Sequence, residues 1–382
     1  MRILQVPPRY APHIGGVERV AQELSERLAQ RGHTTAVLCA DVPPRAPTTV
    51  NGVPVCRVRA VGKVGNTDIT PTLPWHLARM PFDVAHCHLP TPWSADWTCA
   101  IARLRRKPVV LTYYNRIVGH GPDARLARLY EALVLPITLR LATAVLVQSD
   151  RWHDDLLRRF RSITAKVFVV RNGVDVAFYT PPAEPVRGGP LLFVGVLDAY
   201  HAYKGLDVLL RALVACPGVG LCIVGDGSAR AAIERRTLEL GLAPRVHFRG
   251  QVSRDELAGM YRSASLLVMP SAGSEQEGGH SLVVLEALAS GLPVIVGSGA
   301  GAISETVDGE HIGRAVDAGD VEGLAAAVRA LLADEAERAA MGRRAREWAV
   351  AHASWDAIID EVEAVYVRAQ ATHRAKGRPG GG

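Results

Sequence analysis

Short apolar runs alternate with amphipathic stretches along most of this chain. The clearest amphipathic stretch carries apolar residues at helical spacing from Val17 to Leu28, and Gly32 supplies the expected stop, which predicts a helix. Apolar runs rich in β-branched residues lie on either side of it, at 3–6 and 35–39, and predict strands. Strands that alternate with helices in this way are typical of α/β proteins with parallel sheets.

The alternation occurs as two series. Strands of the first series are predicted at 3–6, 35–39, 84–88, 109–113, 144–147 and 166–170. Strands of the second are predicted at 191–194, 221–224, 246–249, 266–269 and 293–296, with helices at 206–213 and 281–290. Proline and glycine concentrate between the series, which predicts a linker there. The predicted parts are a first domain at 1–175, a linker at 176–190, a second domain at 191–345, a helical segment at 346–370 and a disordered tail at 371–382.

Composition agrees with a two-domain globular protein. The 382 residues are 48% hydrophobic and 21% charged, which excludes a disordered or low-complexity chain. No apolar run of about 18 residues occurs, so no membrane span is predicted. The start, MRILQVPPRY, lacks the long apolar segment of a signal peptide. We therefore expect a cytoplasmic protein, with peripheral attachment to the inner membrane surface left open.

Net charge and cysteine content limit the classes of ligand that the chain is expected to bind. The formal net charge of +6 suits an anionic ligand or an anionic membrane surface, and nucleic acid is not predicted as a partner. The six cysteines form no CxxC pair, so neither disulfides nor a metal site is predicted. Trp93 and Trp97 precede a basic stretch at 103–107, which is interpreted either as a membrane-contacting surface or as a half-buried helix with a solvated end.

The pair Gly15 and Gly16 follows the first predicted strand and opens the first helix. Glycines let the backbone approach a ligand, and the free N–H groups of a helix start favour phosphate. An ordinary turn before a helix is the alternative. His86 and His88 alternate along a later strand, so both face one side of the sheet, in a structural or an acceptor-lining role.

Lys204 lies between the first strand and the first helix of the second series. An ammonium group there would neutralise charge that develops on a departing diphosphate, and a solvated loop lysine is the alternative. His201, three residues earlier, is interpreted as an ordinary loop histidine or as a second group that reaches the same diphosphate.

The segment 270–294 carries the densest group of candidate residues. A helix is predicted to begin at Ser281, so its first N–H groups, including those of Leu282 and Val283, would hold a diphosphate. Glu277 in the preceding loop would accept a hydrogen bond from a sugar hydroxyl, and Glu286 within the helix would meet a ribose diol. Paired carboxylates also raise the alternative of glycoside hydrolysis, which the division between loop and helix disfavours.

Four motifs occur in a characteristic order along the chain. They are Gly-Gly-x-Glu near the start, Lys-Gly-x-Asp after a Val-Gly strand, Val-Gly-Asp-Gly at 224–227, and Leu-Glu-Ala-Leu-Ala-x-Gly-x-Pro-Val at 285–294. Together they resemble the motifs of the retaining family 4 glycosyltransferases. The resemblance spans roughly 3–370. It implies the GT-B fold, in which two Rossmann-like domains face a cleft and a C-terminal helix crosses back to the first domain. It also implies sugar transfer from a nucleotide diphosphate donor, which is a co-substrate, with no further cofactor and no metal.

By this resemblance the second domain binds the donor and the first binds the acceptor. Gly15 and Gly16 would touch the donor phosphates and Lys204 the diphosphate. Glu286 would hold the ribose. The remaining donor-binding positions implied by the family are Ser281, Leu282, Val283, Gly225 and Gly227.

Several positions depart from the family pattern. Tyr114 stands where a histidine usually contacts the donor sugar, and it is expected to position that sugar in the histidine's place. Arg116 stands where an acidic residue is usual and is expected to bind an anionic group of the acceptor or of the donor. Val196 replaces an arginine that lies beside the diphosphate in many relatives. One residue more than usual separates Glu277 from Glu286, which is interpreted as a loop bulge, with Gly278 in the place of the first glutamate as the alternative.

These observations predict a metal-independent retaining glycosyltransferase with Lys204, Glu277 and Tyr114 as catalytic residues. The acceptor class, which is a lipid, a glycan or a small natural product, stays open, as does the nucleotide. A catalytically silent, donor-binding pseudoenzyme is the main alternative, and a sugar-nucleotide epimerase is a further one.

Overall fold

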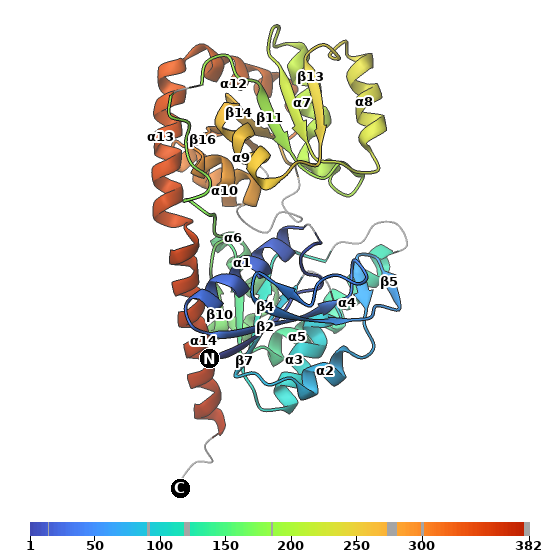
Figure 1. Ribbon diagram of the computed structural model, residues 1–382. Helices are drawn as coiled ribbons and strands as arrows, with labels where there is room; N and C mark the ends of the chain where they lie inside the picture. Colours follow the sequence, from blue (N-terminus) through green and yellow to red (C-terminus); the bar gives the residue numbers. More distant parts are fainter. Residues whose placement is uncertain are drawn as a thin grey trace. The chain divides into compact units, whose positions relative to one another are not determined.

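The computed structural model describes residues 1–13, 15–89, 92–117, 123–184, 186–272, 281–298 and 302–377 (Figure 1). They fall into two compact units. Unit 1 comprises Met1–Arg171 together with Asp356–Gly382, and unit 2 comprises Asn172–Trp355.

Unit 1 is built on an eight-stranded sheet with the strand order β10-β9-β8-β7-β1-β2-β4-β3. Neighbouring strands pair in parallel, except that β3 pairs with β4 in antiparallel register. The strands of this sheet are β1 (Arg2–Val6), β2 (Thr34–Ala40), β3 (Thr49–Val50), β4 (Val53–Val58), β7 (Val84–Leu89), β8 (Val109–Tyr113), β9 (Ala144–Val147) and β10 (Val167–Val169). A separate antiparallel hairpin pairs β5 (Gly62–Val64) with β6 (Thr67–Ile69).

The helices of unit 1 come mostly from the connections between parallel strands, as right-handed crossovers require. They are α1 (Gly16–Gln30), α2 (Leu73–Arg79), α3 (Ser94–Leu104), α4 (Asp123–Leu133), α5 (Leu135–Leu141), α6 (Asp150–Arg159) and the 3₁₀-helix η1 (Arg161–Lys166). The last helix, α14 (Trp355–Gly377), belongs to this unit from Asp356 onward. Arg31 at the end of α1 donates to the carboxylates of Asp360 and Glu363, which fixes α14 to the rest of the unit.

Unit 2 is built on a six-stranded parallel sheet with the order β13-β12-β11-β14-β15-β16. Its strands are β11 (Leu191–Val194), β12 (Leu221–Val224), β13 (Val246–Gly250), β14 (Leu266–Met269), β15 (Val294–Gly297) and β16 (Gly313–Val316). Its helices are η2 (Ala202–Lys204), α7 (Leu206–Val214), α8 (Arg230–Glu239), α9 (Arg254–Ser263), α10 (Leu282–Ala289), α11 (Ala302–Gly309), α12 (Val321–Ala333) and α13 (Glu335–His352).

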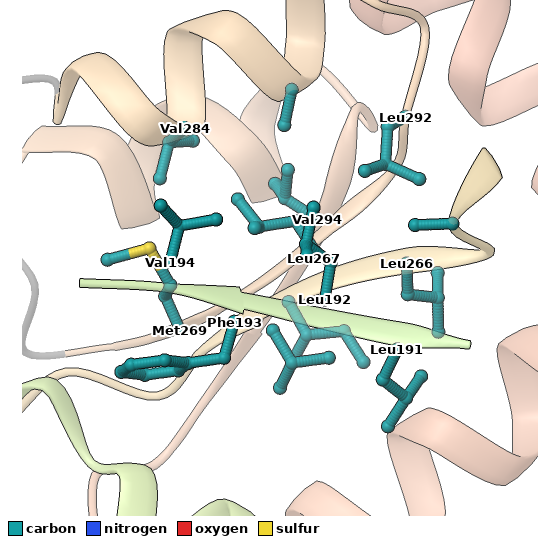
Figure 2. Packing of buried hydrophobic residues seen from close by; sticks show 14 of the residues in the cluster. Leu191, Leu192, Phe193, Val194, Leu266, Leu267, Met269, Val284, Leu292 and Val294 are labelled. Atoms are coloured by element: carbon teal, nitrogen blue, oxygen red, sulfur yellow. The ribbon is translucent and has the colours of Figure 1, made fainter. Parts of the chain in front are cut away.

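The central strands of unit 2 are buried along their whole length. Every residue of β11 and of β14 is buried, as expected for parallel strands with helices on both faces. Figure 2 shows this packing, with Val284 of α10 lying over the strands near Val194. Because Val284 and Leu285 are anchored in this core, the start of α10 is held beside the carboxyl edge of the sheet.

The predicted strands and helices are largely confirmed, and β4 is a strand that the sequence interpretation missed. β4 pairs in parallel with β2 and extends the sheet. Pro54 falls inside it, and a proline within an apolar run argues against a strand because it cannot donate to the ladder. Here Pro54 lies opposite Thr49 of the two-residue β3, close to the edge of the sheet, where a lost donor is tolerated.

The boundaries between the parts differ from the expected ones. The division falls between Arg171 and Asn172, ahead of the expected linker at 176–190, because the following segment packs on unit 2. The Val174 N–H, for example, donates to the Ala353 carbonyl at 2.7 Å. The chain returns to unit 1 at Asp356, within the helical segment expected at 346–370. The expected disordered tail at 371–382 is wrong for 371–377, because α14 continues to Gly377.

Candidate functional site

The strand order of unit 2 reverses between β11 and β14, and ligands of open α/β sheets bind at such a switch point beyond the carboxyl ends of the strands. Residues predicted to bind the donor follow these strands. Gly225 and Gly227 come directly after β12, Lys204 follows β11, and Ser281 precedes α10 after β14. Topology therefore brings most of the predicted donor-binding positions to one edge of one sheet.

Gly225 makes this edge compact. Its φ of +123° lies where side chains are rarely accommodated, and a Cβ there would fall 1.9 Å from the Gly195 carbonyl oxygen. The Gly225 N–H donates to the Gly250 carbonyl, and the Gly195 N–H donates to that of Val224. Gly227 approaches the Leu197 carbonyl in the same way, at 2.2 Å from a built Cβ. Both glycines thus bring the ends of β11 and β12 into close backbone contact.

Lys204 ends the one-turn helix η2 beside the end of β11. A Cβ built on Gly195 would lie 3.2 Å from Cδ and 3.5 Å from Nζ of Lys204, so the lysine side chain runs along the glycine backbone. The next residue, Gly205, has a φ of +77°, and its Cβ would fall 2.3 Å from the Pro270 carbonyl oxygen. Glycine at 205 therefore lets η2 sit against the end of β14, and it holds Lys204 at the switch point.

The start of α10 lies after β14 in the same unit. Ser281 is its N-cap residue and makes no side-chain capping bond. The first N–H groups of α10, those of Leu282 and Val283, are among the orphan donors that every helix start carries. Ser281, Leu282 and Val283 are all half-buried. Glu277 lies outside the described residues, so its predicted contact with the sugar stays a prediction.

Glu286 is held by two tyrosines in the second turn of α10. Its carboxylate oxygens accept hydrogen bonds from Tyr179 Oη at 3.0 Å and from Tyr261 Oη at 2.9 Å. Burial, and then the Glu286 charge, raise the pKa of both phenols, so both remain protonated donors. A carboxylate has lone pairs beyond these two, and a ribose diol remains a compatible further partner. Sequence reasoning missed both tyrosines, because nothing local links positions so far apart along the chain.

In unit 1 the start of α1 already has an acidic partner. The turn at Gly15 and Gly16 brings the Glu18 side chain back over the first turn, where a Cβ on Gly15 would lie 2.1 Å from Glu18 Oε2. Burial raises the pKa of the Glu18 carboxyl. A carboxylate at the helix start competes with a phosphate for the same N–H groups. Phosphate binding at Gly15 and Gly16 therefore stays a prediction, and the local geometry disfavours it.

His86 and His88 lie in a buried hydrogen-bonded chain, which favours the structural one of their two predicted roles over the acceptor-lining one. His86 bonds Tyr366 Oη and Thr112 Oγ1, both at 2.7 Å. His88 bonds Gln5 Oε1 at 3.0 Å and Tyr114 Oη at 2.9 Å. Both imidazoles are 0% exposed, because α14 covers this face of the sheet through Tyr366. They are therefore structural residues.

Tyr114 directs its hydroxyl inward at the end of β8. Its side chain is 8% exposed, and its Oη is bonded to His88 Nδ1. The neighbouring Arg116 pairs with Asp155 of α6, with Nη2 at 2.7 Å from Oδ1. Tyr114 is thus the last residue of the hydrogen-bonded chain that contains His88, and Arg116 forms an ion pair within unit 1. Their predicted roles toward sugar and acceptor stay predictions that these contacts do not favour.

The buried histidines make stability depend on pH. Burial lowers the pKa of His88 to about 3 and that of His86 well below its usual value. In the unfolded chain both titrate near 6.5, so below that pH the unfolded state binds more protons than the folded state. Stability is therefore full above about pH 6.5 and declines as pH falls toward 3. We expect a slope of up to about 1.4 kcal/mol per pH unit for each histidine in that window.

Urea denaturation at a series of pH values measures this slope. His88→Gln removes one titrating group and should give a shallower decline, whereas His247→Gln on exposed β13 should not change it. An identical slope for His88→Gln and the unchanged protein would contradict the assignment.

Among the described residues, no group of three or more histidine, cysteine, aspartate or glutamate side chains is arranged to hold a metal ion. All six cysteines are free thiols. In the described part of the chain, no helix has the length and apolar character that a membrane crossing requires.

Comparison with known families matches both halves of the chain. A family model described as Glycosyltransferase Family 4 matches residues 14–178, and one described as Glycosyl transferases group 1 matches residues 184–348. The D-inositol 3-phosphate glycosyltransferase of Mycolicibacterium smegmatis is 31% identical, over 77% of this chain and 69% of that protein. The glycogen synthase of Mycobacterium tuberculosis is 28% identical, over 98% of this chain and 96% of that protein.

Solved structures share the same fold. The sucrose-phosphate synthase of Thermosynechococcus elongatus superposes with a TM-score of 0.78 at 24% identity, over 97% of this chain and 100% of that one. HepE of Anabaena, in complex with UDP and glucose, superposes with a TM-score of 0.78 at 18% identity, over 96% of this chain and 100% of that one.

Proposed function

This chain belongs to the family 4 glycosyltransferases of the GT-B fold. On that premise we propose that it transfers a sugar from a nucleotide diphosphate donor to a hydroxyl acceptor, with retention of the anomeric configuration. The observation that carries the proposal is the position of Lys204, whose ammonium group is placed by Gly195 and Gly205 at the switch point of the unit 2 sheet.

In the proposed reaction the C1–O bond between the sugar and the β-phosphate breaks, and a C1–O bond to the acceptor forms. The acceptor hydroxyl proton passes to the departing β-phosphate oxygen, so atoms and charge balance. Lys204 and the first N–H groups of α10 would stabilise the negative charge that develops on the diphosphate, which is where most of the rate gain would arise. Glu286 would bind the ribose. We propose that no metal ion takes part, because these residues supply the positive charge.

The experiment supplies UDP-glucose, GDP-mannose and related donors with candidate acceptors and measures release of the nucleoside diphosphate. Relatives guide the choice: HepE is solved with UDP and glucose, and a Mycolicibacterium smegmatis relative, 28% identical over 96% of this chain, is named phosphatidyl-myo-inositol mannosyltransferase. We expect release that survives EDTA and a product whose anomeric proton coupling matches that of the donor. An inverted product, or release that a chelator abolishes, would contradict the mechanism.

We also propose that unit 1 contacts an anionic membrane surface through an apolar stripe on α4 and α5. Leu126, Leu129, Leu133 and Ile137 recur at helical spacing and are 48 to 59% exposed. The arginines beside them, Arg125, Arg128 and Arg140, are exposed and complement anionic lipid headgroups.

For the region around Trp93 and Trp97, the contacts support the interpretation as a half-buried helix over that as a membrane-contacting surface. The Trp93 indole N–H donates to the Thr70 carbonyl at 3.2 Å, and the Arg105 guanidinium donates to the carbonyls of Leu77 and Met80 at 2.7 Å.

Vesicle co-sedimentation tests the stripe. We expect binding to vesicles that contain anionic lipid and little binding to neutral vesicles. The double substitution Leu129→Glu and Leu133→Glu removes two apolar contacts and adds repulsion, so binding should fall at least about tenfold. Leu238→Glu, on α8 and 66% exposed, is the matched control and should bind as the unchanged protein does. Equal binding of the stripe variant and the control would contradict this surface.

A further inference from the structure

An aspartate–histidine pair lies in the loop that connects β11 to Lys204. Asp198 Oδ1 lies 2.8 Å from His201 Nδ1 and also accepts a hydrogen bond from the His201 backbone N–H at 2.8 Å. Although burial raises the pKa of Asp198, the hydrogen bonds from His201 hold it below its usual value. Asp198 is therefore a carboxylate that accepts a hydrogen bond from the Nδ1–H of His201 and fixes the orientation of the ring.

The pair lies at the start of the short helix η2, which ends at Lys204. His201 is the N-cap residue of η2, and the Lys204 N–H donates to its carbonyl at 3.0 Å. The Tyr203 carbonyl accepts the Ala272 N–H at 2.7 Å, which ties this turn to the loop after β14. His201 is thus fixed at the edge where Lys204 lies.

The edge of His201 that faces away from Asp198 is available to a ligand. Among the residues that the structure describes, Nε2 has no hydrogen-bond partner, and the side chain is 27% exposed. The rings of Tyr200 and Tyr203 flank the imidazole at centroid distances of 5.1 and 6.1 Å. Val196, five residues before His201, is exposed and brings no charge to this loop.

We propose that His201, held by Asp198, is a second cationic catalytic residue that hydrogen-bonds the donor diphosphate beside Lys204. This inference rests on the proposed function, since it assigns a further contact to the same leaving group. Protonated His201 donates Nε2–H to a phosphate oxygen, and Asp198 stabilises the imidazolium from the opposite edge. His201 keeps its proton throughout, because the acceptor hydroxyl supplies the proton that the departing phosphate takes up.

The loop after β12 brings further charged groups close to this turn. The Leu197 N–H donates to the Asp226 carbonyl at 3.0 Å, which brings the loop after β12 against this turn. The Asp226 carboxylate pairs with Arg230 at 3.4 Å and accepts the Gly227 N–H at 2.8 Å. Among the described residues, the charged and titratable groups that these contacts place near His201 are Asp198, Lys204, the two flanking phenols and the Asp226–Arg230 pair, whose arginine also pairs with Glu234 at 2.8 Å.

Equilibrium binding of nucleoside diphosphates and monophosphates to the full-length protein tests the proposal. His201→Gln should weaken diphosphate binding at least about tenfold, as expected for a lost charge-assisted hydrogen bond, and leave monophosphate binding within about twofold. His247→Gln, a matched histidine on β13, should behave as the unchanged protein does.

Asp198→Asn provides an internal check. It leaves the imidazole in place and removes its carboxylate partner, so we expect a smaller loss of diphosphate affinity than in His201→Gln. The double variant should bind no more weakly than His201→Gln alone, because Asp198 acts through His201.

The outcomes separate this proposal from the proposed function. If the unchanged protein binds no nucleoside diphosphate, both the role of His201 and the proposed function are contradicted. If it binds and Lys204→Ala weakens binding, while His201→Gln matches His247→Gln in its affinity for diphosphate, the role of His201 is overturned and the proposed function stands. Equal losses for diphosphate and monophosphate in His201→Gln would assign His201 a structural role only.

Discussion

Lys204→Ala is expected to lower kcat by about 100- to 1,000-fold, the usual cost of removing one preorganised group that stabilises charge in a transition state. The side chain lies along Gly195, where the ends of β11 and β14 meet, and an alanine cannot reach the diphosphate from there. Because the charge on the leaving group grows during bond cleavage, kcat should fall more than the affinity for the donor. Steady-state kinetics with the preferred donor measure both.

Lys63→Ala is the matched control, because Lys63 lies exposed in the hairpin strand β5. Its kcat and thermal stability should equal those of the unchanged protein. Lys204→Arg keeps a positive charge in altered geometry and should retain more activity than Lys204→Ala. An unchanged kcat for Lys204→Ala would remove Lys204 from the mechanism.

Gly225→Ala is expected to destabilise unit 2 by about 3 kcal/mol or more, from the cost of a side chain at positive φ together with a backbone overlap. The new Cβ would fall 1.9 Å from the Gly195 carbonyl oxygen, and neither backbone can move without displacing the end of β11. The same displacement moves Gly195 away from Lys204, so activity should fall even in the fraction that remains folded. Denaturant unfolding and kinetics below the transition measure the two effects.

Gly241→Ala separates conformational strain from overlap. Gly241 also has a positive φ, +68°, but nothing lies within 4 Å of its built Cβ. It should cost only the strain of about 1 to 2 kcal/mol, with activity unchanged. Equal destabilisation of the two variants would show that the overlap with the Gly195 carbonyl adds nothing to the loss of stability in Gly225→Ala.

Local patterns predicted the parts of the fold that depend on local sequence. The periodicity from Val17 to Leu28 marked α1, and the glycines around 225 and the lysine at 204 marked the carboxyl edge of unit 2. These signals succeed because each depends on neighbours in the chain, such as helical spacing or a turn that only glycine permits.

Contacts between distant parts of the sequence could not be read in advance. The sequence left a structural and an acceptor-lining role open for His86 and His88, and the contact that favours the structural role is a hydrogen bond between His86 and Tyr366 of α14, 280 residues away. In the same way, Tyr179 and Tyr261 hold Glu286 although neither belongs to a motif. Tyr114 could be recognised as an unusual residue, yet its inward orientation depends on His88 in the neighbouring strand.

The pairing of Tyr114 with His88 also bears on the histidine that is usual at this position. A histidine side chain is shorter than a tyrosine, so Tyr114→His would leave the buried His88 Nδ1 without its partner. An unpaired buried polar atom costs about 1 to 3 kcal/mol. The tyrosine is therefore part of the internal packing of unit 1, and its presence does not by itself indicate a silent enzyme.

Thermal unfolding against a panel of nucleoside diphosphates and nucleotide sugars, for the unchanged protein and for Lys204→Ala, tests the central claim most directly. A ligand at 100 times its dissociation constant stabilises the folded state by about 2.7 kcal/mol, which is readily measured. The account predicts stabilisation by one nucleotide class, and a clearly smaller shift for Lys204→Ala at the same ligand concentration. No stabilisation by any member of the panel, or an equal shift in both proteins, would contradict a diphosphate site at Lys204.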